Sequence, residues 1–348
     1  MSTVRTQALQ HPNAISPAIS LLNTGAADVV ASTINSGPLA GFRNVVLNGN
    51  FDIWQRATSH SSVGYGSADR WNNNISGSAC TISRQSFTVG QTDVPGNPRF
   101  FCRAVTTSVA GAGNYAILSQ AIESVRTFAG QTVTASFWAK ADAARSIAFE
   151  LVQAFGTGGS TIVTGIGTAK VNLSTTWQRI SLTVMVVPSI SGLTIGTADD
   201  YLGFNIWLDA GSNYNSRTNT LGQQSGTFDI SRVQLEPGTM ATSLEARPIQ
   251  TELNLCKRYG QWVPFNMLFY ASVAGQYLES TMTWPEMRKT PFAATLTADP
   301  NTTQAAYNNA QNTIGRLTPY GGSCILQATS GSLSSYVTGY RSWLDAEI

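Results

Sequence analysis

The sequence predicts an all-β protein, and three observations carry that prediction. Charged residues make up only 11% of the 348 residues, so neutral polar side chains must cover most of the surface. From residue 44 onward, short apolar runs are separated by turns rich in Gly, Asn and Ser. Within 132–139, every second residue is apolar, which places these side chains on one face of a strand. We therefore expect an extended N-terminal arm, a jelly-roll β-sandwich, a short helix linker and a smaller C-terminal β domain.

Residues 1–40 are predicted to form the arm. Arg5 and Asp28 are its only charged residues, and prolines and glycines interrupt every periodic run. The arm nevertheless carries apolar residues that it cannot bury by itself, among them Leu9, Ile15, Ile19, Leu21 and Leu22. We expect these residues to attach the chain to a partner.

Residues 41–247 are predicted to form the sandwich. Besides 132–139, the clearest strands are expected at 146–155, 177–187, 201–210 and 226–235. The glycine cluster at 155–160 follows a strand and precedes no helix, which favours a hairpin turn over a phosphate-binding loop. Five tryptophans in strand-like segments are expected to pack in the core: Trp54, Trp71, Trp138, Trp177 and Trp207.

A linker helix is predicted within 248–260, and a C-terminal β domain over 261–348. Ile249, Leu253 and Cys256 recur at helical spacing, and Pro248 suits the start of a helix. A helix this short is marginal alone, so we expect Leu253 and Cys256 to be buried near the axis of a homotrimer. The C-terminal domain is a candidate receptor-binding tip.

Composition and motifs argue against several functions. A net charge of +2 is too small to drive nucleic-acid binding. No stretch has the roughly 20 apolar residues of a membrane span, and the first ten residues do not form a secretory signal. The four cysteines lie far apart, so we expect free, buried thiols.

Catalysis is not expected either. The sequence has only two histidines, and it lacks a nucleophile elbow, a phosphate loop and a zinc-binding histidine pair. A glycosidase would need only two carboxylates. Acids such as Glu123, Glu150 and Asp209 lie in or near strands, but their spacing selects no pair.

Motifs at both ends of the sandwich resemble a known family. The runs are Leu-Asn-Gly-Asn-Phe-Asp-Ile-Trp-Gln-Arg at 47–56, Ala-Asp-Arg-Trp at 68–71 and Gly-Thr-Phe-Asp-Ile-Ser-Arg-Val-Gln-Leu-Glu-Pro-Gly at 226–238. Together they resemble the jelly-roll domain of bacteriophage tail fibre proteins, which is similar to carbohydrate-binding modules. The resemblance covers about 44–260, and the segments 4–22 and 339–348 are similar to the two ends of such fibres.

The resemblance implies a virion structural protein, made in the host cytoplasm, that is trimeric and recognises the host. Its implied partners are other virion proteins, bound through the arm, and a host cell-surface glycan; nucleic acid and membrane insertion are not expected. A capsid-surface fibre or decoration protein is the alternative function, and a glycan-depolymerising tailspike enzyme is a second one. Sugar rings stack on aromatic faces, so we select tyrosines in polar loops and near the C-terminus as ligand-binding candidates: Tyr65, Tyr201, Tyr214, Tyr336 and Tyr340. The alternative is that they anchor turns.

The resemblance also suggests a structural calcium ion, because related sugar-binding sandwiches often hold one at the ends of the domain. Asp52 and Asp229 occupy comparable terminal strands and could supply hard oxygen ligands. The alternative is that these acids pair with Arg56 or Arg232. No other cofactor is expected.

Overall fold

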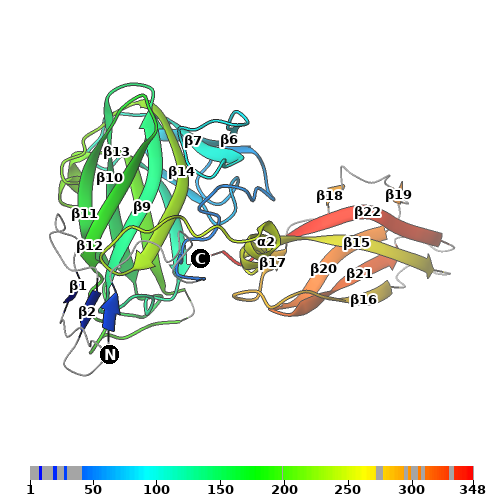
Figure 1. The fold of residues 1–348 in the computed structure, drawn as a ribbon. Helices are drawn as coiled ribbons and strands as arrows, with labels where there is room; N and C mark the ends of the chain where they lie inside the picture. Colours follow the sequence, from blue (N-terminus) through cyan, green and yellow to red (C-terminus); the bar gives the residue numbers. More distant parts are fainter. Residues whose placement is uncertain are drawn as a thin grey trace, which may run out of the picture.

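The protein consists of a large β-sandwich and a smaller C-terminal β domain, joined by one helix (Figure 1). This computed structural model describes residues 41–197, 199–271, 277–293, 297–298, 305–306, 310–328 and 333–347, and three short strands at 8–9, 19–21 and 27–29. The predicted all-β class, with its jelly-roll sandwich, linker helix and second β domain, is confirmed. No helix in the described part of the chain is long and apolar enough to span a membrane.

The sandwich is built from two antiparallel sheets. The first has the order β11-β10-β13-β8-β5, with bounds Val163–Leu173, Arg145–Ala154, Tyr201–Ala210, Tyr115–Glu123 and Asn72–Ser76. The second has the order β12-β9-β14-β7-β6-β4, with bounds Gln178–Val186, Thr132–Ala141, Gly226–Pro237, Phe100–Thr107, Ala79–Ser86 and Ser59–His60. We call them the five-stranded and the six-stranded sheet. The five predicted strands correspond to β9, β10, β12, β13 and β14, and the glycine cluster forms the β10–β11 turn.

The core lies between these sheets because each strand turns alternate apolar side chains inward. Phe51 and Trp71 are completely buried, and their rings pack with centroids 5.0 Å apart. Trp207 is also buried, but it lies outside this core, in a separate cluster with Ile117 and Leu221. Trp54 is half-buried and packs against the core, whereas Trp138 and Trp177 are half-buried outside this cluster. The strand pattern did not show which face of the sheet each tryptophan occupies.

Helix α2, Ile249–Lys257, leads into the C-terminal domain and lies within the predicted range of 248–260. Cys256 is only 1% exposed and is therefore already buried within a single chain, whereas Leu253 is partly exposed. The expected burial of this helix near the axis of a homotrimer stays a prediction. Cys80, Cys102 and Cys256 are free and buried, as expected. The side chain of the fourth cysteine, Cys324, lies outside the described part.

The C-terminal domain contains two antiparallel sheets. One has the order β15-β22-β17, with bounds Gly260–Ala271, Leu333–Asp345 and Phe292–Ala293, and β18 (Thr297–Ala298) and β19 (Ala305–Ala306) also pair with β22. The other has the order β16-β21-β20, with bounds Tyr277–Thr283, Gly321–Ala328 and Ala310–Thr318. The chain end returns to the sandwich, where Glu347 binds the buried Arg70 and accepts a 3.0 Å bond from Arg56 (Figure 1). Buried charges therefore join the two domains.

The described parts of the arm are three short strands that pair with one another. They are β1 (Ala8–Leu9), β2 (Ile19–Leu21) and β3 (Ala27–Val29), in antiparallel order. Leu9, Ile19 and Leu21 lie in these strands, whereas Ile15 and Leu22 lie outside the described residues. The proposed role of these residues in attachment stays a prediction.

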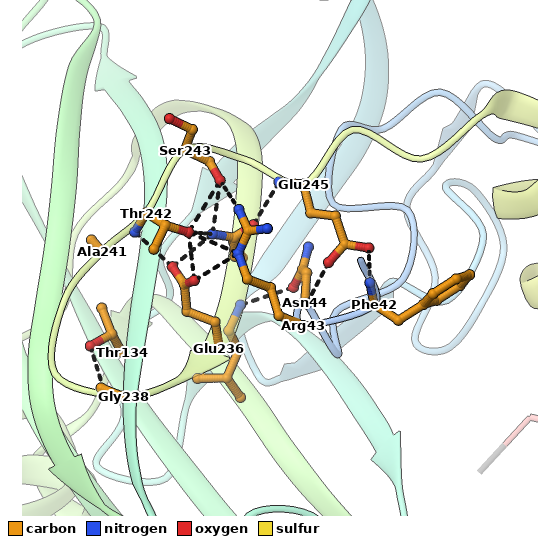
Figure 2. Close-up of polar contacts among 12 residues, drawn as sticks. Phe42, Arg43, Asn44, Thr134, Glu236, Gly238, Ala241, Thr242, Ser243 and Glu245 are labelled. Atoms are coloured by element: carbon orange, nitrogen blue, oxygen red, sulfur yellow. Dashed lines mark hydrogen bonds and ion pairs between the residues drawn. The ribbon is translucent and has the colours of Figure 1, made fainter. Parts of the chain in front are cut away.

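Where the arm joins the sandwich, the buried carboxylate of Glu236 organises a polar network (Figure 2). It accepts hydrogen bonds from Arg43 at 3.1 Å and from both the backbone N–H and the hydroxyl of Thr242, at 2.8 and 2.6 Å. Glu245 accepts a 2.6 Å bond from the backbone N–H of Phe42. The network thus fixes the chain at 42–44 against the loop at 241–245.

Candidate functional site

The candidate site is a groove on the outer face of the five-stranded sheet. It encloses about 270 Å³. Aromatic and amide side chains dominate its lining: Tyr65, Tyr115, Tyr201, Trp207, Tyr214, Asn72, Asn74 and Asn205. No carboxylate lines it among the described residues, and Arg217 is its cation.

The alternation of β13 explains how one strand supplies both groove and core. One face of β13 lines the groove with Tyr201, Asn205 and Trp207. The residues between them belong to the sandwich core: Leu202, Phe204, Ile206 and Leu208. Because side chains of a strand point alternately to its two faces, burial of the apolar set directs the other set outward.

Small residues form the floor of the groove. Gly203 of β13 pairs with Ala121 of β8, and both line the groove. A Cβ atom placed on Gly203 would lie 3.3 Å from both the ring of Tyr201 and the Cβ of Val152. A larger residue at position 203 would therefore fill the hollow and displace its wall.

A buried carboxylate fixes the polar end of the groove. Glu150 of β10 is fully buried and lies opposite Asn205 in the sheet. It accepts hydrogen bonds from the Asn205 amide at 3.2 Å, the Trp207 indole at 3.1 Å and the Nε of Arg217 at 3.1 Å. The backbone N–H of Gly165 donates a further 2.8 Å bond. These donors satisfy the carboxylate, so Glu150 acts as a positioning residue and neutralises the charge of Arg217.

Helix α1, Asn215–Thr218, and the short 3₁₀ helix η1, Ser212–Tyr214, place Arg217 and Tyr214 over the sheet. The guanidinium of Arg217 lies 5.0 Å from the Trp207 ring centroid. Tyr115, Trp207 and Tyr214 pack against one another with centroids 5.1 to 5.7 Å apart. This aromatic cluster gives one end of the groove a rigid apolar wall.

The groove tyrosines carry neutral hydroxyl groups. Burial raises the pKa of Tyr65, Tyr115 and Tyr201 above the ordinary value of 10.0. At neutral pH each hydroxyl therefore keeps its proton and can both donate and accept a hydrogen bond. The groove combines aromatic faces with neutral hydrogen-bonding groups.

The structure brings three of the five tyrosines selected from the sequence into this one groove, namely Tyr65, Tyr201 and Tyr214. Only Tyr65 lies in a loop; Tyr201 begins β13 and Tyr214 ends η1. Tyr336 and Tyr340 lie in β22, opposite Leu268 and Phe265, and their side chains lie outside the described part. Ligand binding by these two residues stays a prediction.

The two acids selected for calcium have different partners. Asp229 accepts hydrogen bonds from Arg103 at 2.7 and 2.8 Å, and Lys140 lies 3.7 Å away, so its cations are not the expected Arg56 and Arg232. Asp52 accepts a 2.7 Å bond from Asn50. Burial raises the pKa of Asp52, and the Asn50 bond offsets only part of this shift. Among the described residues, no group of three or more His, Cys, Asp or Glu side chains could hold a metal ion.

Sequence reasoning missed the role of the Glu150–Arg217 pair and the amide residues of the groove. Glu150 had been noted only as one of several strand acids, and Arg217 is 67 residues away. Asn72 and Asn74 alternate with the buried Asn73 in β5, so a run of three asparagines in a strand is the signal that could have pointed to a polar outer face.

No family model and no curated protein matches the sequence. Among solved structures, a CBM4 module is similar at 16% identity and a TM-score of 0.31, over 55% of this chain and 98% of the module. A family 11 carbohydrate-binding module from Clostridium thermocellum, in complex with a β-1,3-1,4-mixed-linked tetrasaccharide, is similar at 11% identity and a TM-score of 0.31, over 54% and 98%.

The enzymatically active domain of tailspike protein 4 from bacteriophage CBA120 is similar at 14% identity and a TM-score of 0.32. The match covers 58% of this chain and 22% of that one. At these identities and TM-scores, the likenesses describe neither the ligand nor the activity of this chain. The assignment of its fold rests on its own strands and their pairing.

Proposed function

We propose that this chain is a non-enzymatic glycan-binding protein of a bacteriophage virion, and that the groove binds a neutral glycan on the host surface. The observation that carries the proposal is the convergence of Tyr65, Tyr201 and Tyr214 on one hollow beside amide side chains, with the buried Trp207 packed behind Tyr214. Aromatic faces suit the apolar faces of sugar rings, and amides and hydroxyls suit sugar hydroxyl groups. Because Glu150 neutralises Arg217, the lining suits an uncharged ligand.

The virion assignment rests on the motifs at 47–56, 68–71 and 226–238 and on the composition of the arm. We propose a trimeric tail fibre whose arm attaches it to other virion proteins. A capsid-surface fibre is the alternative, and electron microscopy of labelled virions separates the two locations. Deletion of residues 1–40 should prevent incorporation into particles, whereas a truncated protein that still assembled onto virions would contradict the role of the arm.

A depolymerising enzyme would need two carboxylates beside its ligand. The lining of the groove contains none among the described residues, which supports a binding function. Glu150, which contacts three of the lining residues, is held by four donor groups and covered by Arg217.

The test is binding of a panel of neutral bacterial oligosaccharides to the full chain, measured by calorimetry. We expect Tyr201→Ala to weaken binding of the recognised glycan by about tenfold or more. Tyr320→Ala is the matched control, because Tyr320 is 60% exposed and lies in the C-terminal domain. Loss of binding with the Tyr320 variant alone would move recognition to the predicted tip, and no saturable binding by the wild-type chain would refute the proposed function.

A further inference from the structure

A second hollow lies on the opposite side of the sandwich, on the outer face of the six-stranded sheet. It encloses about 140 Å³. Trp138 of β9 lies between Arg179 of β12 and Ser231 of β14 in the register of the sheet. Arg179 and Arg232 line the hollow together with Trp138, Ser136 and Ser243. Two guanidinium groups and one indole ring therefore share a small site.

A break in the strand places Arg232 in this hollow. The pairing of β14 with β9 shifts register between Ser231 and Gln234, and Arg232 adopts a left-handed backbone conformation with φ of 56°. A side chain in that conformation costs free energy that the surrounding structure must supply. Its guanidinium lies against Gly96, because a Cβ atom on Gly96 would come within 2.6 Å of Nη1. The local fold thus holds a half-buried arginine in a fixed position.

Arg179 and Arg232 have no carboxylate partner among the described residues. Arg179 donates hydrogen bonds to the backbone carbonyl groups of Ala241 and Thr242, at 3.2 and 2.5 Å. Burial lowers the pKa of Arg232, and the positive charge of Arg179 lowers it further. Two like charges in one hollow oppose each other, and a bound anion would relieve this repulsion.

The nearby acids are already engaged. Arg232 also lines the neighbouring hollow that contains Asp52, Glu245 and Glu252. Glu245 and Glu252 both form ion pairs with Arg247, at 3.1 and 3.2 Å. Asp52 accepts a bond from the neutral Asn50 amide, and the charge that acts on Arg232 is that of Arg179. Within the described residues, neither Arg179 nor Arg232 is therefore ion-paired with a carboxylate.

The wall of the hollow is fixed before any ligand binds. The loop at 241–245 supplies Ser243 and the two carbonyl groups that hold Arg179. Glu236 anchors this loop through Thr242, and Arg43 donates a further bond to the carbonyl group of Ser243 (Figure 2). A fixed wall reduces the ordering cost of binding.

We propose that this hollow is an anion site that binds an acidic sugar, with the carboxylate or phosphate group between Arg179 and Arg232 and the ring against Trp138. The two guanidinium groups supply the donors that a planar carboxylate or a phosphate prefers. Trp138 is half-buried, so part of its ring stays accessible for an apolar contact. The site differs from the neutral groove in charge and lies on the other sheet, so it does not depend on the function proposed for the groove.

The experiment titrates the full chain with glucuronic acid and with glucose 6-phosphate, and follows binding by calorimetry and tryptophan fluorescence. We expect saturable binding of at least one of them that weakens as salt is added. Arg232→Gln and Arg179→Gln should each reduce affinity about tenfold or more. Arg232→Lys should restore part of the loss, and Arg126→Gln is the control because Arg126 is exposed and lies outside the hollow.

Four further results decide the proposal. Tyr201→Ala should leave acidic-sugar binding unchanged, whereas loss of binding in that variant would assign the acidic sugar to the groove. If acetate or inorganic phosphate bound as tightly as the acidic sugars, the proposed contact of the sugar ring with Trp138 would be wrong. If neutral glucose bound as tightly as the acidic sugars, the proposed anion site between Arg179 and Arg232 would be wrong. Absence of binding by the folded wild-type chain at millimolar concentration would overturn the whole proposal. Circular dichroism of each arginine variant distinguishes a lost contact from a lost fold.

Discussion

The two outer faces of the sandwich show how one architecture can present a neutralised arginine on one face and arginines unpaired with any described carboxylate on the other. On the five-stranded sheet, Arg217 is neutralised by Glu150, which is fully buried beneath it. On the six-stranded sheet, Arg179 and Arg232 share a hollow and no described carboxylate pairs with either. Both sheets are antiparallel, so the difference comes from single residues. Glu150 faces outward from β10 beneath Arg217 of α1, and Arg232 lies at the register shift of β14. The partner of an arginine, more than its presence, therefore decides what kind of ligand a face can accept.

The largest expected effect tests the charge pair of the five-stranded sheet. Glu150→Gln leaves Arg217 without its counter-charge, and we expect the free energy of unfolding to fall by about 3 kcal/mol, because one partner of a buried pair is removed. Asp142→Asn, next to β9 of the other sheet, is the control. Asp142 is 41% exposed in its ion pair with Arg145, so the expected loss is about 1 kcal/mol or less. Urea unfolding of both variants measures the two effects, and equal losses would contradict the distinction between a buried and an exposed ion pair.

The second prediction separates the two faces by ligand. Gly203→Val fills the floor of the groove, since even a Cβ atom there meets Tyr201 and Val152 at 3.3 Å. Neutral-glycan binding should fall by about tenfold or more. Binding of glucuronic acid at the opposite hollow should not change. Parallel calorimetric titrations check both, and a variant that lost both ligands would indicate a damaged fold rather than a filled groove.

Local patterns predicted most of this fold because the strands follow simple alternation. Residues 201–210 were predicted as a strand and form β13 with the same bounds. The same reasoning placed Trp207 in the core and did not indicate which face of the strand it occupies. A tryptophan is compatible with the outer face of a sheet as well as with the inner one when other side chains cover it. Here Tyr214 and Arg217 cover it, from a helical turn whose position depends on tertiary packing.

The candidate site was only partly predictable for a related reason. Tyr65, Tyr201 and Tyr214 were selected for their polar surroundings, and the structure brings them together. The partner of Arg217 could not be selected from spacing, because Glu150 lies on a strand 67 residues earlier and its neighbours along the chain do not mark it. Pairings across a sheet depend on register, which single-sequence patterns do not specify.

The third prediction concerns the charged junction between the domains. Burial raises the pKa of Glu123, but the bonds from Arg258 and Tyr259, at 2.7 and 2.8 Å, bring it below the ordinary 4.5 overall. Ionised Glu123 therefore stabilises the folded state fully above pH 4.5. This stabilisation is lost as the pH falls through the pKa of Glu123 in the folded state, which is lower than 4.5. Asp69 acts with the opposite sign, because burial raises its pKa and acid favours its neutral folded form.

Urea unfolding between about pH 6 and about pH 3 tests this balance. The wild type should lose more stability over that interval than Glu123→Gln, which removes the titrating group and keeps the shape of the side chain. The variant isolates Glu123 from the opposing contribution of Asp69. Identical pH profiles for the two proteins would show that the junction does not respond to the ionisation of Glu123.

The smallest expected effect concerns the thiols beneath the six-stranded sheet and in α2. Burial raises the pKa of Cys80 to about 11 and the pKa of Cys102 and Cys256 well above the ordinary 9.0. Since the thiolate is the reactive form, all three should resist an aromatic disulfide reagent at neutral pH until the chain unfolds. A Cys324→Ser variant restricts the assay to these thiols. Rapid native-state labelling would mean that the sandwich or the helix opens locally, and comparing labelling of Cys80 and Cys256 would show which of the two regions does so.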